Sequence, residues 1–153
     1  MTVNVELEKL YLEDREARLK NSFIEKNFKK RFQNIKKILP LIDENEIWNC
    51  HYLAYFFHHS GKKSDYELAY NYAKKAVEMG SNVTKWLLAA TLDRYLVSQG
   101  KLQKFGTQFK KKGNKWERLP VDGSITDEER LKHGVKKLKD IPKLFREKYH
   151  KTQ

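Results

Sequence analysis

The chain has 153 residues, of which 39% are hydrophobic and 34% are charged, and its formal net charge is +12. We expect one domain over residues 1–153, because this length can bury about two-thirds of the unfolded surface in one core. Three prolines, seven glycines and 12% aromatic residues argue against a disordered chain, and the charged fraction argues against a protein embedded in lipid.

The single cysteine, Cys50, excludes an internal disulfide and a cysteine-based zinc site. The first residues lack a basic segment that leads into an apolar run, and the apolar runs elsewhere are too short to cross a bilayer. We therefore expect a cytoplasmic protein without a membrane partner.

Hydrophobic residues at helical spacing predict five helices, over residues 4–20, 22–39, 47–59, 64–79 and 82–99. The first two are expected to form an antiparallel pair. Ser64 and Glu67 have the spacing of a capping box, which predicts the start of the fourth helix, and Gly80 stands where a C-terminal glycine is expected.

The rest of the chain predicts a small β-hairpin near residues 107–119, because a lysine-rich turn separates two short extended runs. Thr126 and Glu129 form a second capping box that opens a helix ending near Gly134, and Asp140 with Pro142 predicts the start of a last helix. The expected fold is mainly α, either a single-domain helical bundle or a short stack of antiparallel helix pairs.

Asp93 is unusual within the fifth predicted helix. A helical wheel places its carboxylate inside the apolar arc of the helix, so the side chain is expected to be buried. A buried carboxylate needs a cation, strong donors or a bound proton. A structural role, in which Asp93 holds a loop or a helix end, and a functional role carry about equal weight.

The helix over residues 47–59 carries three histidines. On the wheel His59 lies beside Trp48, Tyr52 and Tyr55, whereas His51 and His58 lie apart from it and two turns from each other, too far to share a metal ion. We expect no metal site. His59 could be an ordinary core residue or a neutral imidazole base in an aromatic cleft.

A polar run without acidic residues follows the fifth predicted helix and contains Gln103, Gly106, Thr107 and Gln108. Two amides, a hydroxyl and a glycine that permits close backbone approach suit hydrogen bonding to a polar or anionic ligand. The spacing fits neither a phosphate-binding loop nor a dinucleotide fingerprint. The alternative is a turn whose glutamines tie the hairpin to the helices.

The order Asp93-Arg94, then Gly100, then Gln103-x-Phe105-Gly106-Thr107-Gln108, then an acidic helix start, resembles a bacterial family of unknown function. Members of that family carry Asp-Arg and Gln-x-Tyr-Gly-(Thr/Ser)-Gln in this order. His59 takes the position of the family's histidine, whereas His58 and Glu67 stand where relatives tend to have glutamine. The resemblance implies a helical domain with a clustered His/Asp/Arg/Gln constellation and no established activity.

Three functions stay open. In the first, a pocket gathers His59 as acid or base, Asp93 as its orienting carboxylate, and ligand-binding residues Arg94, Gln103, Gly106, Thr107 and Gln108, for a small anionic or amide-bearing ligand and without a cofactor. The second is a tetratricopeptide-like module that binds a protein partner, indicated by the repeat-like stretch over residues 72–80. The third is nucleic-acid binding, because residues 100–153 contain 16 Lys and Arg but only 7 Asp and Glu.

Overall fold

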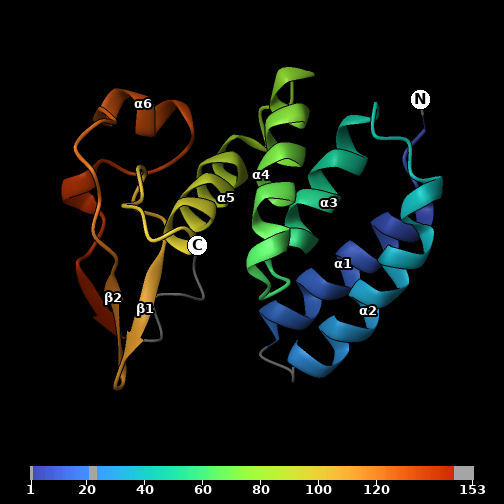
Figure 1. The fold of residues 1–153 in the computed structure, drawn as a ribbon, viewed down its shortest axis with the longest axis horizontal. Coiled ribbons are helices and arrows are strands. Elements are labelled where there is room, and N and C mark those ends of the chain that lie inside the picture. The colour runs from blue at the N-terminus through green and yellow to red at the C-terminus, as the bar shows by residue number, and fades with distance from the viewer. Residues whose placement is uncertain (1, 21–23, 147–153) are drawn as a thin grey trace. The chain divides into compact units, whose positions relative to one another are not determined.

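The computed structural model of the protein describes residues 2–20 and 24–146. Contacts within the chain group it into two compact units, residues 1–81 and 82–153, called here the N-terminal and C-terminal units. Figure 1 shows the helices α1 to α4 of the first unit and the helices and strands of the second. One domain over residues 1–153 stays a prediction.

The N-terminal unit is made of helices α1 (Val5–Leu19), α2 (Ile24–Ile38), α3 (Ile47–His58) and α4 (Lys63–Glu78), with a short 3-10 turn η1 (Leu39–Leu41) after α2. α1 starts at Asn4, whose side chain accepts a hydrogen bond from the backbone N–H of Leu7 at 3.0 Å. Glu46 caps α3 in the same way, accepting from the N–H of Asn49 at 2.8 Å. These caps satisfy donors that have no partner within the helix.

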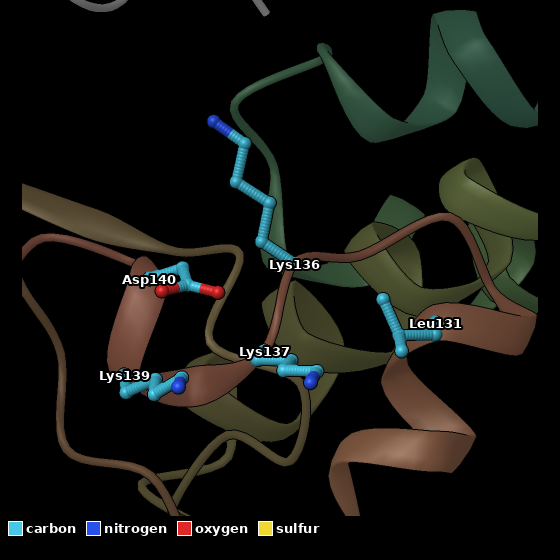
Figure 2. Close-up of a pocket in the computed structure, with 5 residues that line it drawn as sticks. All are labelled: Leu131, Lys136, Lys137, Lys139 and Asp140. Atoms are coloured by element: carbon cyan, nitrogen blue, oxygen red, sulfur yellow. The ribbon is translucent and has the colours of Figure 1, made fainter.

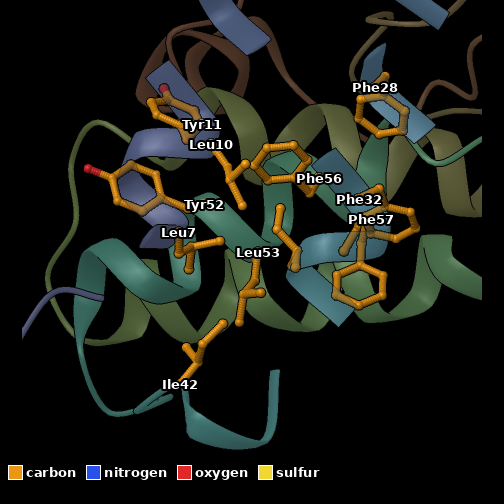
Figure 3. Close-up of a cluster of buried hydrophobic side chains, with 12 residues drawn as sticks. Leu7, Leu10, Tyr11, Phe28, Phe32, Ile42, Tyr52, Leu53, Phe56 and Phe57 are labelled. Atoms are coloured by element: carbon orange, nitrogen blue, oxygen red, sulfur yellow. The ribbon is translucent and has the colours of Figure 1, made fainter. Parts of the chain in front are cut away.

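The core of the N-terminal unit lies between α1, α2 and α3, with one alanine from α4 (Figure 3). Its buried members are Leu7, Leu10, Tyr11, Phe28, Phe32, Ile35, Ile42, Tyr52, Leu53, Phe56, Phe57 and Ala69. Asp14 is fully buried beside them, where it accepts hydrogen bonds from Arg18, Arg31 and Tyr55 at 2.6, 3.2 and 2.7 Å. The Asp14 carboxylate therefore links α1, α2 and α3, and its two arginine partners compensate the cost of burying its charge.

The C-terminal unit contains helix α5 (Lys85–Ser98), strands β1 (Phe109–Lys112) and β2 (Lys115–Arg118), helix α6 (Asp127–Lys132), the 3-10 turn η2 (Leu138–Asp140) and strand β3 (Leu144–Arg146). The strands form one antiparallel sheet in the order β1-β2-β3. A second small core contains Ala89, Phe105, Val135 and Ile141. Helix, loop and turn residues thus meet around the segment that joins α5 to the sheet.

The structure confirms a mainly helical fold with a small β-hairpin near residues 107–119. Two local predictions are wrong. The last helix is not formed at Asp140, because residues 138–140 make the turn η2 and the following residues pair with β2 as β3. Ser64 does not cap α4, which starts at Lys63 after Lys62 and without a side-chain cap. No helix in residues 2–20 and 24–146 has the length and apolar character to cross a membrane.

Candidate functional site

Asp93 is fully buried in α5, which confirms the expectation from the helical wheel. Its Oδ1 accepts hydrogen bonds from the backbone N–H groups of Lys104 and Phe105 at 2.7 and 2.9 Å. Its Oδ2 accepts from the N–H and the hydroxyl of Thr107 at 3.0 and 2.8 Å. Four donors from one loop therefore satisfy this carboxylate, and the partner of Asp93 is the backbone of that loop.

The two glutamines of the loop also bond to backbone. The amide nitrogen of Gln103 donates to the carbonyls of Gln108 and Leu119 at 3.0 and 2.8 Å, and its oxygen accepts from the N–H of Gln108 at 2.8 Å. Gln103 is fully buried. Its side chain thus closes the loop on itself and ties it to the residue that follows β2, rather than to a helix as the structural alternative expected.

Arg94 lies next to the same loop. Its Nε donates to the side-chain oxygen of Gln108 at 2.9 Å, and the amide nitrogen of Gln108 lies 3.1 Å from the hydroxyl of Thr107. Asp93, Arg94, Gln103, Thr107 and Gln108 therefore lie together, whereas their role as a ligand site stays a prediction. Their polar groups bond to one another and to the loop.

Gly106 has a positive φ of 90°, a conformation that L side chains rarely adopt. A Cβ at this position would lie 3.2 Å from Cδ1 of Ile141. The glycine is required by backbone conformation and by packing against the second core, which explains its place in the loop without a ligand.

Arg130, which the sequence pattern did not indicate, is the cationic counterpart of Asp93. It is 2% exposed, and its guanidinium donates to the carbonyls of Phe105, Lys104 and Ile125 at 3.3, 3.1 and 2.7 Å. Asp93 thus binds the N–H groups of the loop, whereas Arg130 binds its carbonyls. The available sequence signal was the spacing of three residues from Asp127 in α6, with which Arg130 forms an ion pair at 3.3 Å, and this spacing is common on helix surfaces.

His59 belongs to the N-terminal unit, where it follows α3. Its Nδ1 lies 2.8 Å from the carbonyl oxygen of Tyr55, and its ring centroid is 4.5 Å from that of Tyr55. It is half-buried, whereas His51 and His58 are buried. The predicted pairing of His59 with Asp93 in one pocket stays a prediction.

His51 is a buried histidine of α3 surrounded by aromatic rings. It packs edge-on against Tyr11, Trp48 and Tyr52 at centroid distances of 5.6, 5.6 and 5.8 Å. Burial, together with the charge of Arg15, lowers the pKa of His51 to about 4. A histidine that stays neutral at physiological pH in an aromatic environment can act as a base, but here its Nε2 lies 3.3 Å from the Tyr11 hydroxyl.

A tetratricopeptide-like module would bind its partner through an exposed aromatic groove, and four aromatic residues of the N-terminal unit that could form one differ in exposure. Trp48 is 41% exposed, whereas Tyr55, Tyr66 and Tyr70 are half-buried. Neither full burial nor a fully exposed aromatic surface is found, so the protein-interaction hypothesis stays a prediction.

The C-terminal unit contains an open cleft that the sequence analysis did not predict. Its volume is about 480 Å³, and Figure 2 shows its lining residues along the end of α6, the segment that follows, and η2. We call it the lysine cleft, lined by Leu131, Lys136, Lys137, Lys139 and Asp140. Three cations and one carboxylate around an open space suit an anionic group.

The sheet adds a second basic surface. In the observed register Lys110 faces Glu117 and Lys112 faces Lys115, so these four side chains share one face of the hairpin. We call Lys110, Lys112 and Lys115, all exposed, the basic hairpin face. The opposite face carries aromatic residues, since Phe109 and Phe145 are in contact at 4.9 Å between ring centroids.

Metal binding finds no support in the described ranges 2–20 and 24–146, where no three His, Cys, Asp or Glu side chains are grouped so that they could hold an ion. Comparison with protein-family models, curated proteins and solved structures gives no match. The resemblance to a bacterial family therefore stays an expectation, and the function has to be argued from the geometry and the charge.

Proposed function

We propose that the C-terminal unit binds nucleic acid through contacts with the phosphate backbone. The observation that carries this proposal is the distribution of charge. Residues 82–153 contain 18 Lys and Arg against 8 Asp and Glu, so this unit holds +10 of the net charge of +12. A field of one sign concentrated on one compact unit attracts polyanions and dominates nonspecific nucleic-acid affinity.

The exposed cations that would make these contacts lie on the basic hairpin face and in the lysine cleft. On the hairpin, Lys110 and Lys112 lie 3.4 and 3.6 Å from Glu117, with more than half of each lysine side chain exposed. Exposed ion pairs of this kind contribute about 0 to 1 kcal/mol, so a phosphate can replace the glutamate at little cost. In contrast, the polar residues around Asp93 already bond within the fold, and they support ligand binding less well.

The test measures binding of the full chain to a labelled single-stranded oligonucleotide and a labelled duplex by fluorescence anisotropy, between about 50 and 200 mM salt. Two triple variants each remove three charges, Lys110, Lys112 and Lys115→Gln from the hairpin and Lys136, Lys137 and Lys139→Gln from the cleft. We expect each to weaken binding and to reduce the salt dependence by about two units of slope, since each phosphate contact contributes about 0.7 to 0.9.

The matched control removes the same charge from the N-terminal unit by Lys37, Lys62 and Lys63→Gln, three exposed lysines. The salt slope counts the charges that contact phosphates, and the proposal places these contacts on the C-terminal unit, so the control is expected to keep the wild-type slope. The proposal is wrong if the wild type does not bind at the lowest salt, or if all three variants weaken binding equally.

The volume of the lysine cleft favours a small anionic ligand as a second candidate. About 480 Å³ falls in the range of small-molecule pockets, although this cleft is open. The same assay separates the two candidates, because a mononucleotide that competes at micromolar concentration would favour a small ligand. Competition by long strands alone would favour nucleic acid.

A further inference from the structure

Trp86 is an exposed aromatic residue whose Cβ lies near Gly134, which stands in the chain between Leu131 and Lys136 of the lysine cleft. It is the second residue of α5, and 44% of it is exposed. On a helical wheel of α5 Trp86 lies in the same apolar arc as Asp93, so a buried side chain would be expected there. The structure instead leaves a large part of this side chain at the surface of a basic unit.

The backbone of Gly134 links Trp86 to the cleft. The Cβ of Trp86 lies 3.9 Å from the position that a Cβ would take at Gly134. Lys136, which lines the cleft, follows Gly134 by two residues, a chain length of at most about 7 Å. Leu131, which also lines the cleft, precedes Gly134 by three residues and is 53% exposed.

An exposed indole next to several lysines has the composition of a site for single-stranded nucleic acid. In such sites bases stack on aromatic rings, whereas cations follow the phosphates. In a duplex the bases are already stacked on one another, so an indole at the protein surface gains no comparable contact. A small inorganic anion would use the lysines but not the tryptophan.

We propose that Trp86 is a base-stacking platform, and that the C-terminal unit therefore prefers unpaired nucleotides, with the phosphates held by Lys136, Lys137 and Lys139. This inference rests on the proposed function and specifies the class of nucleic acid. The neighbouring Leu131 would extend the apolar contact for the base.

The test compares Trp86→Leu with Trp48→Leu, since Trp48 is 41% exposed and lies in the N-terminal unit. The probes are a single-stranded oligonucleotide of RNA or DNA, an abasic strand of equal length and a duplex. We expect Trp86→Leu to weaken binding of the base-bearing single strand about fivefold or more, and to leave the other two probes unchanged. Trp86→Phe should retain most of the affinity, and Trp48→Leu all of it.

A second measurement needs no loss of the side chain. The chain has three tryptophans, so the double variant Trp48→Phe, Trp116→Phe leaves Trp86 as the sole indole. Its emission should be quenched by the base-bearing strand and not by the abasic strand. If the wild type binds the strands, the inference is wrong when Trp86→Leu affects all probes alike or none. It is also wrong when the base-bearing strand does not quench the emission of Trp86. Failure of the wild type to bind any probe would instead overturn the proposed function itself, and this inference with it.

Discussion

Variants that remove hydrogen bonds of the Asp93 carboxylate are expected to destabilise the C-terminal unit, by amounts that increase from Thr107→Val to Asp93→Asn to Asp93→Ala. Thr107→Val removes one of the four hydrogen bonds to this carboxylate, the hydroxyl bond of 2.8 Å, and should cost about 1 kcal/mol. Asp93→Asn keeps an oxygen that can accept from Lys104 and Phe105, but it places an amide donor against the N–H of Thr107.

The magnitude for Asp93→Asn follows from these contacts. One buried N–H without an acceptor costs about 1 to 3 kcal/mol, and loss of the charge weakens the two remaining bonds by roughly half. The sum is about 3 kcal/mol. Asp93→Ala leaves three backbone N–H groups of the loop without an acceptor and should cost about 5 kcal/mol, which is comparable with the whole stability of many domains.

The assay combines urea unfolding with hydrogen exchange of the amides of Lys104, Phe105 and Thr107. These three N–H groups donate to the Asp93 carboxylate, so their exchange reports directly on its hydrogen bonds. Asp122→Asn is the matched control, because the carboxylate of this half-buried aspartate accepts hydrogen bonds from Ser124, and the bond of its backbone N–H to Gln103 does not involve the carboxylate. Its replacement should leave exchange of the loop amides unchanged. A catalytic carboxylate behaves in the opposite way, since replacing a residue that function holds in a strained site commonly stabilises the fold. The reasoning is refuted if Asp93→Asn costs less than Thr107→Val or raises the stability.

Three further outcomes are expected. Arg130→Met should cost about 2 to 3 kcal/mol in urea unfolding, because one buried and two partly buried carbonyls lose their donor, and Arg130→Lys should not restore the loss since lysine lacks the planar fork. Gly106→Ala should cost about 1 kcal/mol more than Gly113→Ala, since both glycines have positive φ but nothing lies within 4 Å of a Cβ at Gly113; equal costs would contradict the packing contact. Because the pKa of His51 is lowered to about 4 in the folded chain, against about 6.5 when unfolded, its contribution is complete above pH 6.5. That contribution, about 3 kcal/mol, should be lost as the pH falls towards 4, and an NMR titration of His51 near pH 6.5 would contradict it.

Most helices could be predicted because their signals are local. Apolar spacing and the capping box of Thr126 and Glu129 can both be recognised within one or two turns of helix. Ser64 shows the limit of such signals, since a capping-box spacing also occurs one residue inside a helix that starts without a side-chain cap. The capping-box spacing identifies the residue types, but it does not determine the backbone conformation of the residues that precede them.

The strand β3 was missed for a different reason. Asp140 and Pro142 are good helix starters, but the residues after them pair with β2, which lies about thirty residues earlier. Pairing between distant segments is decided by tertiary contacts that override local preference. In the same way, burial of Asp93 could be predicted from the wheel, whereas its partners, 11 to 14 residues further along, could not.

The polar loop shows why a candidate site can be recognised from a sequence while its purpose is not. Amides, a hydroxyl, a carboxylate and a glycine are suited to a ligand, and the same groups are suited to a backbone that turns sharply without regular secondary structure. What separates the two cases is whether donors and acceptors are matched within the fold. Around Asp93 and Arg130 they are matched, N–H groups to the carboxylate and carbonyls to the guanidinium. The hairpin face and the cleft each carry three lysines beside one carboxylate, Glu117 on the hairpin and Asp140 in the cleft, so positive charge is in excess at both. Binding is therefore expected at the lysines, where positive charge is in excess. The groups of the loop near Asp93 are satisfied within the fold, which favours a structural role for that loop.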